Sequence, residues 1–210
     1  ESKDNAKIKH LRGLIELNSA RKKHQQTVLE GTHLCLAWLQ QHKKIFSLFT
    51  TEQALDHPEL QKVIELHQGH IFVISEVLYK DLSTLGTTLP CLAIVDLPKT
   101  SLTIDFKADT LILENVQDPG NVGTLLRSAA AANIKQVICT QGSASLWSPR
   151  VLRAGMGAHF SVHCFENFQL TDILPKFQIP VFVTSSHRST SLYSKDLKQA
   201  CVWILGNEGQ

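Results

Sequence analysis

Residues 110 to 133 read TLILENVQDPGNVGTLLRSAAAAN, and the rest of the chain is organised around this stretch. An apolar run at 110–113 is followed by a turn-rich hexamer at 118–123 and by an alanine-rich segment that ends at Asn133. Pro presets φ, Gly accepts positive φ, and Asp and Asn side chains bond nearby backbone amides, so the sequence DPGN is typical of a turn. The pattern predicts a strand, a loop and a helix.

Both ends of this helix carry recognisable residues. Asn121 is the predicted N-cap, and Asn133 is the predicted residue just beyond the C-terminus. Arg127 stands one turn after Gly123, and a cation close to a helix N-terminus opposes the macrodipole, so it suits an anion or a developing oxyanion better than it suits stability. The alternative is an ordinary βα turn with Arg127 on a solvated face, because the stretch is neither a dinucleotide fingerprint nor a P-loop. From these residues alone, both interpretations stay open.

The composition is that of an ordinary globular protein. The chain has 210 residues, enough for one large or two small domains, and 43% hydrophobic with 19% charged residues allows a sizeable core. No run approaches the roughly 18 apolar residues that span a bilayer, and the charged start is not a secretory signal, which predicts a cytoplasmic protein with no membrane partner. The five cysteines form no CxxC pair, so we expect reduced thiols, and the histidine spacing predicts no metal site.

The net charge of +2 hides an asymmetry. Through Lys44 there are nine Lys or Arg against four Asp or Glu, whereas the remainder has twelve against fifteen. Within the basic part, Arg21, Lys22 and Lys23 lie in the polar, turn-like segment 18–26, which we interpret as a phosphate-contacting loop of an RNA-binding protein. A solvated helix face is the alternative, and charge alone would favour it.

Alternating strand and helix patterns predict an α/β protein with two domains. Residues 1–97 form the first domain, with strands at 27–30, 45–50, 71–74 and 91–97. Its helices are expected at 7–17, 33–41, 52–67 and 75–82, with Pro58 splitting the third. The weakly patterned segment 98–107 is the predicted linker.

The second domain, 108–210, repeats the alternation. Strands are predicted at 110–113, 136–140, 161–165, 181–185 and 201–205, and further helices at 148–154 and 170–177. Such βαβ alternation implies a mostly parallel sheet, and ligands of such sheets gather at the carboxyl ends of the strands. The loops 115–123, 185–191 and 206–210 are expected to meet there.

Three segments resemble the motifs of one family. The segment from Asn115 to Arg127 is similar to the first motif of the SpoU/TrmH superfamily of RNA ribose methyltransferases, and 204–210 resembles the second. The segment 148–158 resembles the middle segment, with Gly155 where Ser is usual. The N-terminal half, with Val28 to Gly31, resembles the substrate-binding domain of the ribosomal-RNA branch, which shares a fold with RNA-binding ribosomal proteins. The resemblance covers essentially the whole chain.

The resemblance implies a SPOUT-class α/β fold and the transfer of a methyl group from S-adenosylmethionine to a ribose 2′-hydroxyl of RNA. It implies ribosomal RNA as the substrate, with transfer RNA possible, a role in rRNA processing, and a homodimer. The predicted site residues are then catalytic Arg127, Asn121 and Glu208, cofactor-binding Gly206, Thr184 and Ser185, and RNA-binding Arg21, Lys22, Lys23, Asn115 and Arg153. His187 and Arg188 are further candidates for phosphate contacts. Because a guanidinium cannot readily deprotonate, Arg127 is expected to stabilise the developing oxyanion rather than to act as a base.

The family's third motif, which closes the knot and walls the cofactor pocket, would lie beyond Gln210. The first residue is Glu rather than Met. We therefore expect that the sequence lacks a segment at each end and that the knot is incomplete in this chain. The alternative is a non-catalytic RNA-binding protein of the same fold, without a complete cofactor site.

Overall fold

The stretch that begins at Thr110 forms a strand, a loop and a helix, as its sequence predicts. Strand β5 (Thr110–Glu114) is followed by a turn and by helix α6 (Pro119–Ala131). The helix ends as predicted, because Asn133 has a φ of 62° and the backbone N–H of Ile134 donates to the Ala129 carbonyl at 2.9 Å. These are the features of a Schellman motif, in which a residue in the left-handed region closes the helix.

The computed structural model describes residues 5–41, 43–84, 89–98, 103–185, 191, 194–195 and 197–207. The chain divides into two units. The first comprises Glu1–Lys99 with Trp147–Gly157, and the second comprises Thr100–Leu146 with Ala158–Gln210. Residues 147–157, which lie in the predicted second domain, thus belong to the first unit.

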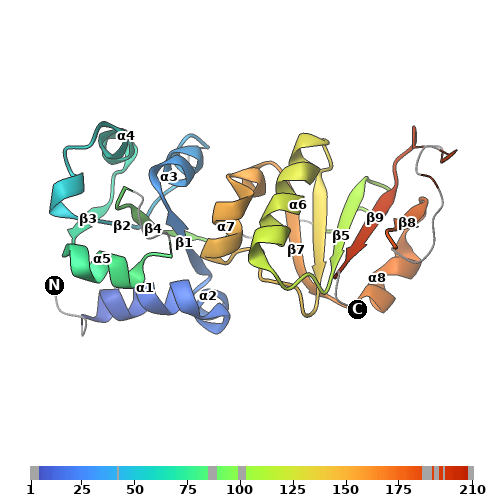
Figure 1. Ribbon diagram of the computed structural model, residues 1–210, viewed down its shortest axis with the longest axis horizontal. Coiled ribbons are helices and arrows are strands. Elements are labelled where there is room, and N and C mark those ends of the chain that lie inside the picture. Colours follow the sequence, from blue (N-terminus) through green and yellow to red (C-terminus); the bar gives the residue numbers. More distant parts are fainter. Residues whose placement is uncertain are drawn as a thin grey trace. The chain divides into compact units, whose positions relative to one another are not determined.

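The second unit contains a five-stranded sheet in the order β7-β6-β5-β9-β8, in which every pairing is parallel (Figure 1). Besides β5, its strands are β6 (Gln136–Thr140), β7 (His163–Phe168), β8 (Val181–Val183) and β9 (Val202–Gly206). The prediction of a mostly parallel sheet is confirmed. The central strands are buried almost throughout, as expected for a sheet covered on both faces.

Helices and a large apolar cluster cover this sheet. The remaining helical elements are η2 (Ala158–Phe160), α8 (Leu170–Ile173) and η3 (Leu174–Lys176). The single helix predicted at 170–177 is wrong, because Pro175 has no N–H to continue an α-helix and the chain tightens into the 3-10 helix η3. The cluster on the sheet comprises Ile112, Ile138, Phe165, Ile173, Val202 and Ile204.

The first unit contains a four-stranded mixed sheet in the order β1-β4-β2-β3. Strand β4 is antiparallel to both of its neighbours, whereas β2 and β3 are parallel. The strands are β1 (Gln26–Glu30), β2 (Ser47–Thr50), β3 (His70–Val73) and β4 (Leu92–Asp96). The helices are α1 (Ala6–Glu16), α2 (Asn18–His24), α3 (Thr32–Leu39), η1 (Glu52–Ala54), α4 (Pro58–Leu66), α5 (Glu76–Leu82) and α7 (Pro149–Gly155).

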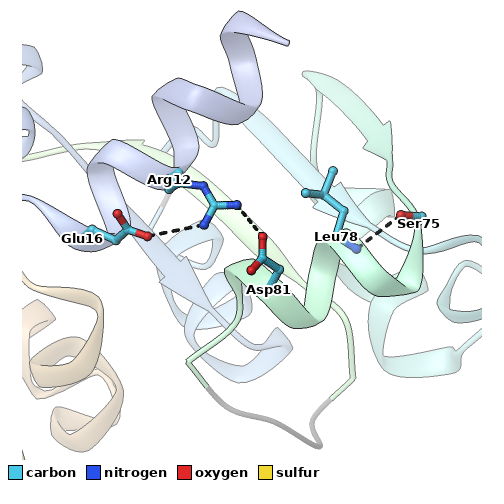
Figure 2. A network of polar contacts seen from close by, with 5 residues as sticks. All are labelled: Arg12, Glu16, Ser75, Leu78 and Asp81. Atoms are coloured by element: carbon cyan, nitrogen blue, oxygen red, sulfur yellow. Dashed lines mark hydrogen bonds and ion pairs between the residues drawn. The ribbon is translucent and has the colours of Figure 1, made fainter. Parts of the chain in front are cut away.

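Helices α1 and α5 pack on this sheet and are joined by an ion pair. Arg12 on α1 lies 2.6 Å from Asp81 on α5 and 3.5 Å from Glu16 (Figure 2). An exposed pair of this kind contributes about 0.2–1 kcal/mol, so the buried residues Ile8, Leu11 and Leu14 hold α1 far more strongly. Ser75 caps α5, where its Oγ accepts the backbone N–H of Leu78 at 3.3 Å (Figure 2).

Of two further predictions for the first unit, the split at Pro58 is confirmed and the loop at 18–26 is wrong. Pro58 does split the segment 52–67, since α4 begins at Pro58 and η1 precedes it. The turn-like loop predicted at 18–26 is wrong, because residues Asn18–His24 form helix α2. Short helices with one buried face are difficult to recognise from seven residues of mostly polar sequence.

The cysteines are reduced, and none is bonded to another. The Sγ atoms of Cys35 and Cys91 lie 3.6 Å apart in the core of the first unit. Burial raises the pKa of Cys164 to about 12, so this thiol is protonated and unreactive near neutral pH. Among the described residues, no helix is long and apolar enough to cross a membrane, and no cluster of three or more His, Cys, Asp or Glu could hold a metal ion.

Candidate functional site

The turn before α6 is capped by Asp118 and not by Asn121. Asp118 Oδ1 accepts the backbone N–H of Asn121 at 2.7 Å, and Pro119 begins the helix. A Cβ at Gly120 would lie 3.0 Å from this carboxylate oxygen, so glycine leaves room for the cap. The predicted N-cap is wrong because Pro119 fits the first helical position, which makes the residue before it the cap. The cap leaves the Asn121 side chain exposed.

Arg127 is exposed on the outer face of α6 and has no hydrogen bond or ion pair with a described residue. It is the ninth of the helix's 13 residues, about 12 Å along the axis from Pro119. The effect of the macrodipole falls off within the first turn, so the argument that Arg127 opposes the dipole is wrong. An exposed guanidinium with no partner among the described residues is available to a ligand.

Asn121 and Arg127 do not share a side of the helix. Six residues correspond to about 9 Å along an α-helix and leave the two side chains about 120° apart around its axis. Asn121 is therefore placed to contact a ligand by itself rather than to orient Arg127, and its catalytic role stays a prediction. Glu208, His187 and Arg188 lie outside the described residues.

Asn115 holds the first-motif loop against the loop after β6. It adopts a φ of 53°, its backbone N–H donates to Thr140 Oγ1 at 3.1 Å, and its Oδ1 accepts from Gln117 at 3.3 Å. A Cβ at Gly142 would lie 2.5 Å from Asn115 Oδ1, so only glycine allows this contact. Asn115 thus forms hydrogen bonds that fix the chain at the end of β5. Its contact with RNA stays a prediction.

The three predicted cofactor residues lie at the ends of neighbouring strands, with Thr184 and Ser185 directly after β8 and Gly206 at the end of β9. Strand β9 pairs with β5 and β8, and Thr184 follows β8, where its N–H and Oγ1 lie 3.1 and 3.3 Å from the Ile204 carbonyl. Thr184, Ser185 and Gly206 are all exposed. A Cβ on Gly206 would meet no atom of a described residue within 4 Å, so the described part of the chain leaves space in front of this strand end. The arrangement brings them to one edge of the sheet, where parallel sheets bind ligands.

Glu114 is a candidate that the sequence analysis missed. It ends β5 directly beside Gly206, and its Oε2 is buried without a hydrogen bond to any residue in the described ranges. A buried carboxylate oxygen normally has a partner, so this atom suits a ligand that donates a hydrogen bond. The sequence feature that could have identified Glu114 is an acidic residue directly after a strongly apolar predicted strand. Glu114 and the space before Gly206 fit a cofactor with amino and hydroxyl donors.

Filling the space before Gly206 tests this cofactor edge. We expect Gly206→Val to lower the affinity for S-adenosylmethionine at least tenfold, because the side chain would occupy the open space, while Gly206→Ala has a smaller effect. The melting temperature should stay unchanged, since valine suits a strand and its Cβ meets no described atom within 4 Å there. Calorimetric titration of the full-length protein measures this. Gly13→Ala, where the new Cβ has only an ordinary contact at 3.7 Å, is the control. Equal affinity of the valine variant and the control would remove Gly206 from the cofactor site.

The basic cluster at 21–23 divides between the interior and the surface. Arg21 is 5% exposed, and its Nη1 donates to the carbonyls of Leu14 at 2.9 Å and Ile15 at 3.3 Å. It therefore joins α2 to the last turn of α1, whose carbonyls have no partner within the helix. Lys22 and Lys23 are exposed. Burial removes Arg21 from the surface that could meet phosphate.

This division predicts two kinds of variant. Replacing Lys22 and Lys23 by Gln should make the plot of log affinity against log salt less steep for single-stranded RNA. The magnitude of the negative slope should fall by about 1.4, because two phosphate contacts are lost. Arg21→Ala should instead destabilise the fold by about 1–3 kcal/mol, because it leaves buried carbonyls without a donor. Fluorescence anisotropy with a labelled 12-residue RNA and urea unfolding measure the two effects. An unchanged slope would mean that Lys22 and Lys23 lie on an ordinary solvated helix face and do not contact RNA phosphates.

Arg153 lies on α7, in the first unit, and is exposed. Together with Gly31, His33 and Met156 it lines a cavity of about 290 Å³. Helix α7 packs on β1, where Thr27 Oγ1 donates to the Trp147 carbonyl at 2.7 Å. The structure thus places Arg153 with the residues of the N-terminal part of the chain, and its contact with RNA stays a prediction.

Comparison with known proteins assigns a family to both parts of the chain. Residues 109–210 match the SpoU rRNA methylase family, and residues 5–93 match the MRM3-like substrate binding domain. Zebrafish mitochondrial rRNA methyltransferase 3B is 35% identical over 195 residues, which cover 87% of this chain but only 43% of that protein. The chain thus spans less than half the length of this relative.

Other relatives match along the whole chain. A Synechocystis protein named as an uncharacterized tRNA/rRNA methyltransferase is 31% identical, with 100% of this chain and 78% of that protein covered. A Bacillus subtilis 23S rRNA guanosine 2′-O-methyltransferase is 25% identical, with 100% and 82% covered. The structure of a TrmH-family protein from Porphyromonas gingivalis superposes with a TM-score of 0.80 at 33% identity, covering 98% of this chain and 82% of that one. The chain therefore belongs to the SpoU/TrmH family of RNA methyltransferases.

Proposed function

We propose that the protein transfers a methyl group from S-adenosylmethionine to a ribose 2′-hydroxyl of RNA, with ribosomal RNA as the substrate. The observation that carries the proposal is the first motif as it is folded: Arg127 is exposed without a partner among the described residues, on the helix that follows β5. The names of the B. subtilis and zebrafish relatives support ribosomal RNA.

The residues of the chain have separate tasks in this reaction. S-adenosylmethionine supplies an electrophilic methyl group when it is bound. The edge formed by Glu114, Thr184 and Gly206 holds the cofactor, with Glu114 Oε2 as a hydrogen-bond acceptor. Arg127 faces the ribose and stabilises the negative charge that develops on the 2′-oxygen. Because its guanidinium stays protonated, the proton of the hydroxyl passes to water or to a substrate phosphate. Alignment of the two reacting groups supplies much of the remaining rate.

The position of Arg127 supports a homodimer. Its Cα lies about 12 Å along α6 from the start of the helix, which is farther than an extended arginine side chain reaches. The proposal is that Arg127 of one protomer faces the cofactor edge of its partner, so that each site needs both copies. Mixing an Arg127→Ala protein with a Gly206→Val protein should then restore activity at one of the two sites of the mixed dimer. No recovery in a confirmed heterodimer would contradict the shared site.

Mapping of ribose methylation tests the function. Mass spectrometry of ribosomal and transfer RNA from cells with and without the gene should show one missing 2′-O-methyl group in ribosomal RNA. A change confined to transfer RNA would move the substrate to that class. No change, together with no binding of S-adenosylmethionine by the full-length protein, would favour a non-catalytic RNA-binding protein. A cytoplasmic location belongs to the proposal, and cell fractionation that finds the protein in mitochondria would contradict it.

A further inference from the structure

One edge of the sheet in the first unit collects the starts of three strands. Gln26 at the start of β1 pairs with Asp96 at the end of β4, and Ser47 at the start of β2 pairs with Ile94 of β4 and His70 of β3. Neighbouring strands are about 4.8 Å apart, so the four strand ends form an edge of about 15 Å. We name it the amino edge, and it includes the residues that directly precede β1, β2 and β3.

Cations from two separate segments meet at the amino edge. Lys22 and Lys23 lie in the last turn of α2, three to four residues before β1, and Lys43 and Lys44 lie three to four residues before β2. Lys44 is exposed, and Lys43 is half-buried with its Nζ 4.6 Å from the centre of the Trp38 ring. Partial burial lowers the pKa of Lys43 from its ordinary value. The one acid at a strand end here is Asp96, which accepts from Gln26 at 3.2 Å.

Phe46 stands exposed among these cations. Its backbone N–H donates to the Ile94 carbonyl at 2.9 Å, which fixes the chain, yet 46% of the residue is exposed. Phe46 lines a cavity of about 490 Å³, whose wall also includes Leu66 and Gly69. A second cavity, of about 320 Å³, is lined partly by Trp38 and Leu97. Lys43, Lys44 and Phe46 line both cavities, so the exposed aromatic ring borders two hollows that each have lysines in their walls.

An exposed aromatic ring between cations and hollows has the chemistry of a site for single-stranded nucleic acid. The ring stacks on a base of any type, and lysines contact the phosphates on either side. We propose that the amino edge binds single-stranded RNA, with a base stacked on Phe46 and phosphates held by Lys22, Lys23, Lys43 and Lys44. The proposal rests on the proposed function only in that the substrate is RNA. It extends the predicted cluster at 21–23 to a segment about 20 residues later in the chain.

The test separates charge from stacking. A fluorescein-labelled 12-residue single-stranded RNA of mixed sequence is titrated with the full-length protein between 50 and 200 mM KCl, a range in which phosphate contacts dominate the change. The double variant Lys43→Gln with Lys44→Gln should make the plot of log affinity against log salt less steep, with the magnitude of its negative slope smaller by about 1.4. Phe46→Ala should weaken binding about tenfold and leave the slope unchanged, because stacking involves no counterion release.

The matched control removes the same charge elsewhere. Lys62→Gln with Lys80→Gln changes two exposed lysines on α4 and α5, which do not line the two cavities. Thermal unfolding of each variant checks that the fold is retained. If the edge variants bind the RNA as the control does, the proposal is wrong. If they lose binding to phosphatidylglycerol vesicles but not to RNA, the edge serves a membrane surface, and the proposal is equally wrong.

Failure of this proposal is distinguishable from failure of the proposed function. A protein that methylates RNA while its edge variants bind normally would contradict only the amino edge. A protein that methylates no RNA but whose binding depends on Phe46 and Lys44 would contradict only the methyl transfer.

Discussion

Arg127→Ala should lower the rate constant of ribose methylation about 10³-fold, because it removes the charge that stabilises the developing 2′-oxyanion. The loss should appear in kcat, and the affinity for RNA should change little, since the charge on the oxygen exists only in the transition state. Single-turnover methylation by the full-length protein, with tritiated S-adenosylmethionine and the mapped RNA, measures it. The fold should be intact, because Arg127 is exposed and bonded to no described residue.

Two further variants make this result specific. Arg127→Lys keeps the charge but loses the planar fork of donors, so its rate should lie between those of the wild type and Arg127→Ala. Lys135→Ala removes another exposed cation of the same unit and should leave the rate unchanged. Equal rates for wild type and Arg127→Ala would exclude Arg127 from the mechanism. A loss in both alanine variants would point to net charge instead.

Acidification should destabilise the protein through His159. This residue is 4% exposed, and its Nε2 lies 2.8 Å from the Leu146 carbonyl, so the neutral ring donates from Nε2. Burial lowers its pKa from 6.5 to about 4, and the hydrogen bond to Leu146 offsets only part of this effect. Between these values the unfolded chain binds a proton that the folded protein does not, so stability is complete above pH 6.5 and falls as the pH drops toward 4. The expected loss from pH 7 to pH 5 is about 2 kcal/mol.

A pair of histidine variants isolates this effect. His159→Gln keeps a donor for Leu146 but does not titrate, so its free energy of unfolding should fall about 2 kcal/mol less than that of the wild type between pH 7 and pH 5. His163→Gln changes an exposed histidine four residues later and should retain the wild-type pH dependence. Urea unfolding at both pH values measures the difference. Identical pH dependence in all three proteins would show that His159 does not titrate on unfolding in this range.

Local sequence was sufficient to predict element ends that depend on only a few neighbouring residues. Pro58, Ser75 and Asn133 define element ends because backbone conformation and hydrogen-bonding capacity are properties of single residues. The same logic gave the wrong cap for α6, since Asn121 and Asp118 are both good cap residues and only the position of Pro119 decides between them. Arg127 was then placed too close to the helix start. Placing the start of α6 three residues too late thus led to the wrong conclusion that Arg127 opposes the helix macrodipole.

Burial could not be inferred from charge. Arg21, Lys22 and Lys23 are three consecutive cations, yet the first lies inside and caps α1 while the other two are exposed. A seven-residue helix with one buried position has too short a periodicity to reveal which side packs. The unpartnered Oε2 of Glu114 also depends on neighbours from another strand.

The sequence by itself determined the strands of both units and most of their helices, but not α2. It also determined the parallel sheet of the second unit and the strand–turn–helix of residues 110 to 133, because periodicity and turn chemistry act over short distances in the chain. The tertiary structure alone decided that α7 joins the first unit, that Arg21 is buried while Lys22 and Lys23 are exposed, and that Lys22 and Lys44 share one sheet edge with Phe46. These facts depend on strand register and on packing between elements, which bring together residues that are far apart in the sequence.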